Sequence, residues 1–235
     1  MGVEGVEVRS LANRVVREAL APSGIDLVAS CGVETYDARA PSVARSSALM
    51  PKARGVVVVA SAGRGLWRAF RAYMREDASR WDREHPLDDY AAEHLARAGD
   101  ALAERGIAHR RFEPTIYADP ALDFRALGEL VGLGSLGPFG MLIHKEHGAW
   151  WALRGAFFVD AEVDPPCALP RPCDGCAAPC LSGKGRLEVV DASPEVRARC
   201  VVGQGSRYDD EQIAYHYDRE ATRTRLRHLD VHRRE

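Results

Sequence analysis

The most restrictive feature of this chain is the segment 55–61, GVVVVAS, in which four valines follow one another. A half-buried strand alternates apolar and polar side chains, whereas a strand that is apolar throughout needs apolar cover on both faces. The segment therefore predicts a fully buried strand. Further strands are expected at 25–31 and 107–117, and helices at 8–20 and, in two pieces, over 65–105. Together these segments predict an α+β fold.

The rest of the chain continues this pattern. The connection 32–54 is expected to be irregular, and a helix is expected from Asp119 to about Val131. Residues 141–163 are expected to form a hairpin or paired strands around Gly148. The C-terminal end is charged and is expected to be helical.

One charge interrupts the apolar surface of the second of these paired strands. Alternation would give one face Trp150, Ala152, Arg154, Ala156 and Phe158, and the other face Trp151, Leu153, Phe157 and Val159. Burying an unpaired guanidinium costs several kcal/mol. We therefore expect Arg154 to have an anionic partner or to reach solvent.

Charge and composition exclude several classes of protein. Among 235 residues, 32 Lys and Arg stand against 34 Asp and Glu, so the formal charge of −2 gives no excess of basic surface for DNA. No apolar run approaches the roughly 18 residues of a membrane span, and the N-terminus, MGVEGVEVRS, lacks the regions of a secretion signal. We therefore expect a cytoplasmic protein, a monomer or homodimer, that binds neither DNA nor membranes.

Five of the six cysteines are crowded between Cys167 and Cys200. In a chain without an export signal, such crowding indicates metal or redox chemistry rather than disulfides. Cys173, Cys176, Cys180 and Cys200 could supply four thiolates to zinc or to an iron–sulfur cluster. Their spacing matches neither a zinc ribbon nor a ferredoxin motif, so a loop without metal is the alternative.

Residues 132–137, GLGSLG, match the pattern GxGxxG. A dinucleotide-binding motif must follow a strand and open a helix, whereas this segment follows an expected helix and precedes an expected strand. The glycines would instead allow close approach of a large flat ligand or of a second chain segment. A plain glycine-rich turn is the alternative.

Residues 132–155, GLGSLGPFGMLIHKEHGAWWALRG, resemble the corrinoid-binding superfamily of epoxyqueuosine reductases, reductive dehalogenases and CblC-type cobalamin-processing proteins. Residues 20–165 resemble the epoxyqueuosine reductase core in the same order. IHKEHGAWWALRG resembles the CblC-type strand that carries an essential arginine, here Arg154, and RYDDEQIAYHYDRE resembles the C-terminal signature of that family. Counting back from this signature, Arg199 occupies the place of the family's second important arginine.

The resemblance implies a nitroreductase-like mixed sheet flanked by helices. It places a cobalamin-binding core at 1–165 and a Cys-rich loop with a C-terminal helical segment, packed on that core, at 166–235. It also implies cobalamin bound base-off and an enzyme that removes the upper axial ligand. The reductant would be a glutathione-type thiol held by Arg154 and Arg199, or reduced flavin, or an external reductase. Asp119, one residue from the position of the reductase family's aspartate, is a candidate acid.

The residues expected to contact the corrin come from the glycine-rich segment and the strand after it. They are Gly132, Gly134, Ser135, Leu136, Phe139, Gly140, Met141, Leu142, Ile143, His144, Trp151 and Leu153. Two other functions remain open: a cobalamin-dependent reductase of an organic substrate, related to epoxyqueuosine reductase, and a corrinoid carrier without catalysis. Because the ferredoxin-type spacing is broken, the chain resembles a reductase core that has lost or remodelled its electron path.

Overall fold

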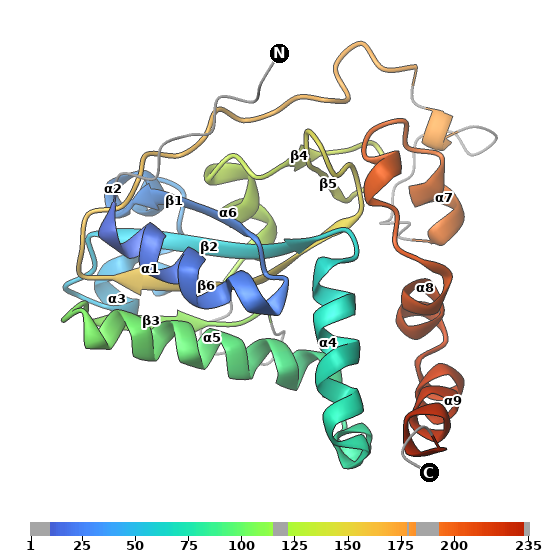
Figure 1. Ribbon diagram of the computed structural model, residues 1–235. Helices are drawn as coiled ribbons and strands as arrows, with labels where there is room; N and C mark the ends of the chain where they lie inside the picture. The colour runs from blue at the N-terminus through green and yellow to red at the C-terminus, as the bar shows by residue number, and fades with distance from the viewer. Residues whose placement is uncertain (1–9, 115–121, 178, 182–192, 233–235) are drawn as a thin grey trace.

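The computed structural model describes residues 10–114, 122–177, 179–181 and 193–232. Within these residues, four strands form the larger sheet, and each neighbouring pair is antiparallel. In spatial order they are β1 (Leu27–Gly32), β2 (Gly55–Ala62), β6 (Trp151–Val159) and β3 (His109–Phe112). The expected α+β architecture with helices flanking a sheet is confirmed (Figure 1). The described pairings are antiparallel where a mixed sheet was expected, because β6 runs opposite to both of its neighbours.

Strand β2 is covered on both faces, as its valines predict. All eight of its residues are buried. Val57 and Val59 pack toward α1, α4 and α5, and Val56 and Val58 pack toward α2, α3 and α6. Burying each such side chain contributes roughly 1.5–3 kcal/mol to folding.

The bounds of these helices largely follow the expected pattern. They are α1 (Leu11–Leu20), α2 (Val33–Asp37), α3 (Ser46–Leu49), α4 (Gly65–Glu76), α5 (Pro86–Glu104) and α6 (Phe124–Leu130). Short 3-10 turns lie at Ala21–Ser23, Ser42–Ala44 and Ala78–Asp82. The connection 32–54, expected to be irregular, contains the two short helices α2 and α3, whose Tyr36 and Leu49 cover one face of the sheet.

The hairpin expected around Gly148 is replaced by a different pairing. The short strand β4 (Ser135–Leu136) pairs with β5 (Leu142–Ile143), while β6 pairs with β2 and β3. A single bridge between His144 and Gly148 joins the two ends of the turn. The apolar faces of β6 explain this, because they are buried only when the strand lies inside the larger sheet.

A β-bulge interrupts β6 at Arg154. Val59 lies opposite Gly155 and Ala60 lies opposite Leu153, so Arg154 is the extra residue. A bulge resets the alternation of side chains along a strand. Trp151 and Leu153 therefore face the same layer as Ala156 and Phe158, which corrects the expected division into faces.

After β6 the chain crosses the top of the molecule and reaches a C-terminal group of helices beside α4 (Figure 1). These elements are the 3-10 turns Pro179–Leu181 and Gln204–Ser206 and the helices α7 (Pro194–Ala198), α8 (Asp210–Tyr217) and α9 (Arg219–His232). Tyr215 of α8 and Leu226 of α9 join the core formed by α1, α4 and α5. Within the described residues, no helix is both long and apolar enough to cross a membrane.

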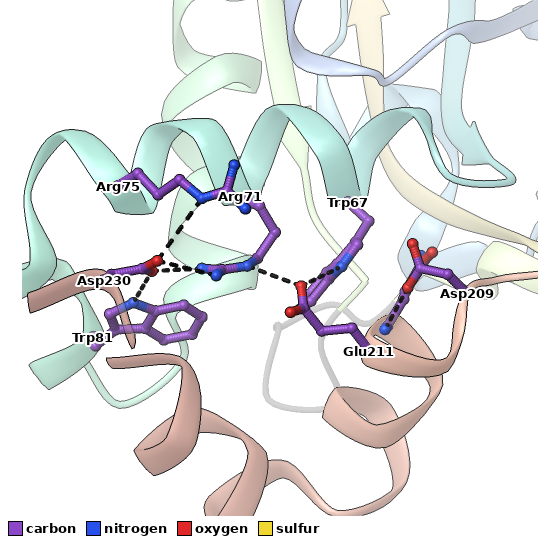
Figure 2. Close-up of polar contacts among 8 residues, drawn as sticks. Trp67, Arg71, Arg75, Trp81, Asp209, Glu211 and Asp230 are labelled. Atoms are coloured by element: carbon purple, nitrogen blue, oxygen red, sulfur yellow. Dashed lines mark hydrogen bonds and ion pairs between the residues drawn. The ribbon is translucent and has the colours of Figure 1, made fainter. Parts of the chain in front are cut away.

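A buried ion pair fastens α9 to α4. Arg71 donates from both Nη atoms to the carboxylate of Asp230, at 2.6 and 3.1 Å, and Trp81 Nε1 donates to the same carboxylate at 3.0 Å (Figure 2). Glu211 of α8 accepts from Arg71 Nε at 3.0 Å and from Trp67 Nε1 at 3.2 Å. Burial alone would raise the pKa of Asp230, but the hydrogen bonds from Arg71 and Trp81, together with the charges of Arg71 and Arg75, hold that pKa below its ordinary value. We call these five residues the latch.

Candidate functional site

The candidate site lies along the exposed edge of β6. Strand β3 pairs only with residues 156–159 of β6, so in the described part of the chain the first half of β6 has a strand neighbour only on the β2 side. Two recesses open along this edge and share Leu153 as a common wall. We call them together the β6 cleft.

The two recesses differ in chemistry. One, of about 280 Å³, is predominantly apolar, and its wall includes Met141, Leu142, Trp151 and Leu153. The other, of about 310 Å³, contains Arg154 and charged side chains. The remaining residues around this second recess are His85, Asp88, Ala91, Ala92, Leu95, Glu113 and Pro114. The cleft can therefore accept a ligand with a broad apolar surface and a polar or anionic end.

Arg154 reaches the cleft because of the bulge. Its side chain is half-buried, and its Nε donates to Ser61 Oγ at 3.0 Å. Burial lowers the pKa of Arg154, and the negative charge of ionised Tyr208 and Asp88 would act in the opposite direction. Among the described residues, Arg154 forms no ion pair. The sequence predicted either an anionic partner or contact with solvent; the described residues provide no ion pair, and the side chain is partly exposed in the charged recess.

A second arginine, Arg197 of α7, lies beside this region and is buried. Its Cζ lies 4.4 Å from the centroid of the Trp150 ring and 4.8 Å from that of Tyr208. Its Nη2 donates to the carbonyl of Ala149 at 2.6 Å and its Nη1 to the hydroxyl of Tyr217 at 3.2 Å. None of these partners is an anion, so the described structure leaves the charge of Arg197 uncompensated.

Unpaired polar atoms gather around these two arginines. In the part of the chain that the structure describes, the buried side-chain atoms without a hydrogen-bond partner are Trp150 Nε1, Arg197 Nε, Gln212 Oε1 and His216 Nε2. We call these four residues the orphan cluster. Tyr208 lies among them, with its ring centroid 5.3 Å from that of Trp150 and 5.6 Å from that of His216.

Such clustering has a cost that a ligand can remove. Leaving a buried polar group without a partner costs about 1–3 kcal/mol. Gln212 and His216 lie one turn apart on α8, so their side chains occupy the same face of that helix. The orphan cluster offers two N–H donors, one amide acceptor and an imidazole to polar atoms from outside the chain.

The electrostatic environment of the orphan cluster is positive. The pKa of His216 is lowered to about 4 by its burial and by the charges of Arg154, Arg197 and Arg219. His216 is therefore neutral near neutral pH. Arg154 and Arg197 both act on this imidazole, so their positive charge extends over the orphan cluster, whereas Asp88 and Glu113 add negative charge to the recess that Arg154 lines.

The structure gives the glycines of residues 132–137 a packing role. Gly132 has φ +76°, and a Cβ there would lie 2.2 Å from the carbonyl oxygen of Cys167. A Cβ at Gly134 would lie 2.8 Å from the Trp151 ring and 3.1 Å from the carbonyl oxygen of Ile143. At both positions a second chain segment makes the close approach, which is one of the two roles expected for these glycines.

The other residues expected to contact a corrin divide between three places. The β6 cleft is lined by Gly140, Met141, Leu142, Trp151 and Leu153. Leu136 and Phe139 line a separate cavity that contains the cysteines. Ser135 lies in β4, opposite the buried Ile143 of β5.

His144 is held by its own turn. Its Nδ1 accepts from the backbone N–H groups of Glu146 and His147 at 3.0 and 3.2 Å, and its ring stacks on that of His147 at 4.6 Å. Burial and the charges of His147 and Lys145 lower the pKa of His144 to about 4. These contacts give His144 a structural role in the turn that precedes β6.

The two remaining candidate residues are Arg199 and Asp119. Arg199 is exposed at the C-terminal end of α7, whereas Arg197, two residues earlier, is buried. Asp119 lies outside the described residues. Sequence reasoning missed Arg197 because the segment RARC offers two arginines, and only the helical phase set by Pro194 decides which one faces inward.

Four cysteines line one cavity of about 460 Å³. They are Cys173, Cys176, Cys180 and Cys200, and Leu136 and Phe139 form part of its wall. Burial, the three other cysteines and Asp174 raise the pKa of Cys173 to about 11. Among the described residues, no group of three His, Cys, Asp or Glu side chains is arranged to hold a metal ion. The four cysteines share a cavity, but in the described structure their side chains do not form a metal-binding group.

Comparison with known proteins gives a likeness of fold. No family model and no curated protein matches the chain. The structure of a B12-trafficking protein, CblC from C. elegans, matches with a TM-score of 0.60 and 15% identity, over 92% of this chain and 94% of that chain. The nitroreductase-like fold expected from the sequence is thereby confirmed.

Two further structures match less closely. Epoxyqueuosine reductase from Bacillus subtilis has a TM-score of 0.49 and 18% identity, over 73% of this chain and 50% of that chain. A reductive dehalogenase has a TM-score of 0.44 and 13% identity, over 98% of this chain and 37% of that chain.

Proposed function

We propose that this chain binds cobalamin base-off in the β6 cleft and uses a carboxylate-bearing thiol, of the glutathione type, to remove its upper axial ligand. The observation that carries the proposal is Arg154: it lies at the bulge, lines the recess that shares Leu153 with the apolar recess, and has no ion-pair partner among the described residues. The fold shared with a B12-trafficking protein along nearly the whole chain supports the choice of a corrinoid.

The residues of the cleft fit such a ligand. A corrin is a wide disc with an apolar face and amide groups at its rim, and ligand sites of this kind combine an apolar wall with a few polar groups. Met141, Leu142, Trp151 and Leu153 supply the wall. Gly140, with φ +84°, lines the same recess and has no side chain to obstruct a ligand. His144, the histidine nearest in sequence to the wall, has its Nδ1 engaged with its own turn, which agrees with binding that uses no protein ligand to the cobalt.

The two arginines would hold the thiol substrate. Guanidinium groups pair with carboxylates through two parallel hydrogen bonds, so Arg154 and Arg197 are suited to the carboxylates of an acidic thiol. Holding the thiol in place raises its effective concentration at the ligand to be removed. The positive charge of both arginines also favours the thiolate over the thiol. Cobalamin, when bound, supplies the cobalt–ligand bond that is broken.

Methylcobalamin and glutathione test the proposal directly. We expect wild-type protein to shift methylcobalamin to its base-off spectrum and to demethylate it when glutathione is added. Arg154→Met and Arg197→Met should lose demethylation and keep the spectral shift, and the exposed Arg199→Met is the matched control. Loss in Arg199→Met with full activity in Arg197→Met would contradict the placement of the thiol.

The same assay distinguishes the proposed function from two alternative functions. A carrier would produce the spectral shift without demethylation in the wild-type protein. An enzyme that takes electrons from reduced flavin or an external reductase would stay inactive with glutathione and become active when a flavin reductase is supplied.

One observation favours a second function, a cobalamin-dependent reductase of an organic substrate. The four-cysteine cavity adjoins the hairpin of β4 and β5, whose Met141 and Leu142 line the β6 cleft, so a metal centre in this cavity would lie near a bound corrin. Metal content and the visible spectrum of protein purified without oxygen test this. Iron at one cluster per chain, lost in Cys176→Ser and kept in the exposed Cys167→Ser, would support it; protein free of iron, or protein that holds only redox-inactive zinc, would contradict it.

A further inference from the structure

His216 has an unusual position within the orphan cluster. It lies near the end of α8, and its Nε2 is enclosed without a hydrogen-bond partner in the described structure. Its ring lies beside that of Tyr208, at 5.6 Å, and that of Tyr215, at 6.0 Å. A buried imidazole nitrogen without a partner is unstable as an acceptor or as a donor, so it gains most from any ligand that offers it a partner.

Charged groups from three elements act on this imidazole. They are the guanidinium groups of Arg154 in β6, Arg197 in α7 and Arg219 at the start of α9. The nearby carboxylate of Asp88 in α5 acts on Arg154 and on Tyr215. In the protein without ligand, a proton on His216 would therefore add a further positive charge to a site that already repels it.

An anion between the two arginines reverses this balance. A bound carboxylate offsets the charges of Arg154 and Arg197, and it can accept a hydrogen bond from a protonated imidazole. We infer that the anion site of the proposed function takes up one proton together with its carboxylate ligand, and that His216 holds this proton. The inference rests on that proposed site and adds that binding of the acidic substrate is coupled to pH.

The coupling has a definite sign. The pKa of His216 is about 4 in the free protein. If the bound anion restores its pKa to the ordinary value of about 6.5, affinity for the anion should rise about tenfold as the pH falls from about 7.5 to about 5.5. Carboxylates of the ligand stay ionised over this range, so they do not produce the change.

Calorimetric titration with S-methylglutathione tests the inference, because this probe keeps the carboxylates and has no free thiol. At about pH 5.5, in two buffers with different ionisation enthalpies, we expect uptake of close to one proton for each ligand bound. His216→Phe keeps a ring of similar size and should abolish both the proton uptake and the tenfold change in affinity. The exposed His228→Phe is the matched control and should keep both.

The possible outcomes are distinct. Binding by the wild-type protein with no proton uptake overturns the role of His216 and leaves the anion site standing. Uptake that persists in His216→Phe also overturns it. If the wild-type protein binds no S-methylglutathione at either pH, the anion site itself fails, and the inference fails with it. Thermal unfolding of His216→Phe verifies that the variant is folded before any of these results is used.

Discussion

Two buried arginines that contact the C-terminal helices differ in their partners: one is paired with carboxylates and the other is not. Arg71, in the latch, has Asp230 and Glu211 as partners (Figure 2). Arg197 has a carbonyl, the hydroxyl of Tyr217 and two aromatic rings, and no anion in the described structure. The same contrast appears at two fully buried indoles, since Trp81 donates to Asp230 whereas Trp150 Nε1 has no partner.

The difference separates structural from ligand-binding use of buried charge. A buried charge that is paired and hydrogen-bonded holds one arrangement of the chain, as in the latch. A buried charge without an anionic partner is a standing cost to the folded state. The orphan cluster carries that cost in the described structure, and the anion of the proposed function would remove it.

The largest expected effect comes from breaking the latch. Arg71→Met leaves the carboxylate of Asp230 buried without its main partner and should lower the free energy of unfolding by about 3 kcal/mol or more. Arg197→Met strands no carboxylate in the described structure and should change it by less than about 1 kcal/mol. Chemical denaturation of both variants measures these free energies of unfolding. Equal losses in the two variants would contradict the difference between the two arginines.

A change at Arg154 should affect activity much more than stability. We expect Arg154→Met to lower kcat/KM for glutathione about 100-fold, which corresponds to about 2.7 kcal/mol of transition-state stabilisation. Its free energy of unfolding should stay within about 1 kcal/mol of wild type, because within the described residues Arg154 donates a hydrogen bond to Ser61 and forms no ion pair. Steady-state kinetics with methylcobalamin gives the first quantity. A loss of stability that accounts for the lost activity would refute the catalytic role.

The two indoles provide a smaller, closely matched test. Trp81→Phe removes a hydrogen bond to a charged group, whereas Trp150→Phe removes a donor that has no partner. Both changes remove a similar volume from a fully buried position. Trp81→Phe should therefore destabilise the protein by about 1.5 kcal/mol more than Trp150→Phe. Equal free energies of unfolding would indicate that Trp150 Nε1 has a partner in solution.

A further expected effect is on the slope of stability against pH. The pKa of His216 is lowered to about 4 in the folded state, so its contribution to stability is present above its ordinary pKa of about 6.5 and is lost as the pH falls toward 4. His216→Phe should make stability fall less steeply in that window; His144 retains a similar dependence. Asp230→Asn should not change the slope there, because the lowered pKa of Asp230 confines its contribution to lower pH. Denaturation at several pH values measures the slopes.

The sequence predicts much of this fold because its signals are local. Four successive valines are enough to indicate β2, and the apolar faces around Arg154 are enough to indicate a guanidinium in need of a partner. The bulge could not be predicted, because it depends on how β6 pairs with β2. The glycines at 132–137 are compatible with either a ligand or a neighbouring chain segment, and only the three-dimensional packing decides between them.

The orphan cluster was beyond sequence reasoning for a similar reason. Trp150, Arg197, Gln212 and His216 come from the turn before β6, from α7 and from α8, and nothing in their spacing indicates that they meet. The pairing of Arg71 with Asp230 is equally remote, with a sequence separation of 159. Side chains that meet only through tertiary packing carry no periodic signal along the chain.

The most direct measurement of the central claim is the visible spectrum of methylcobalamin titrated with the purified protein. If the β6 cleft binds the corrinoid, the spectrum should change to the base-off form and saturate at one cobalamin per chain. Leu153→Arg, which places a charge in the wall shared by both recesses, should abolish the change. A spectrum that stays base-on in the presence of excess folded wild-type protein would contradict the account.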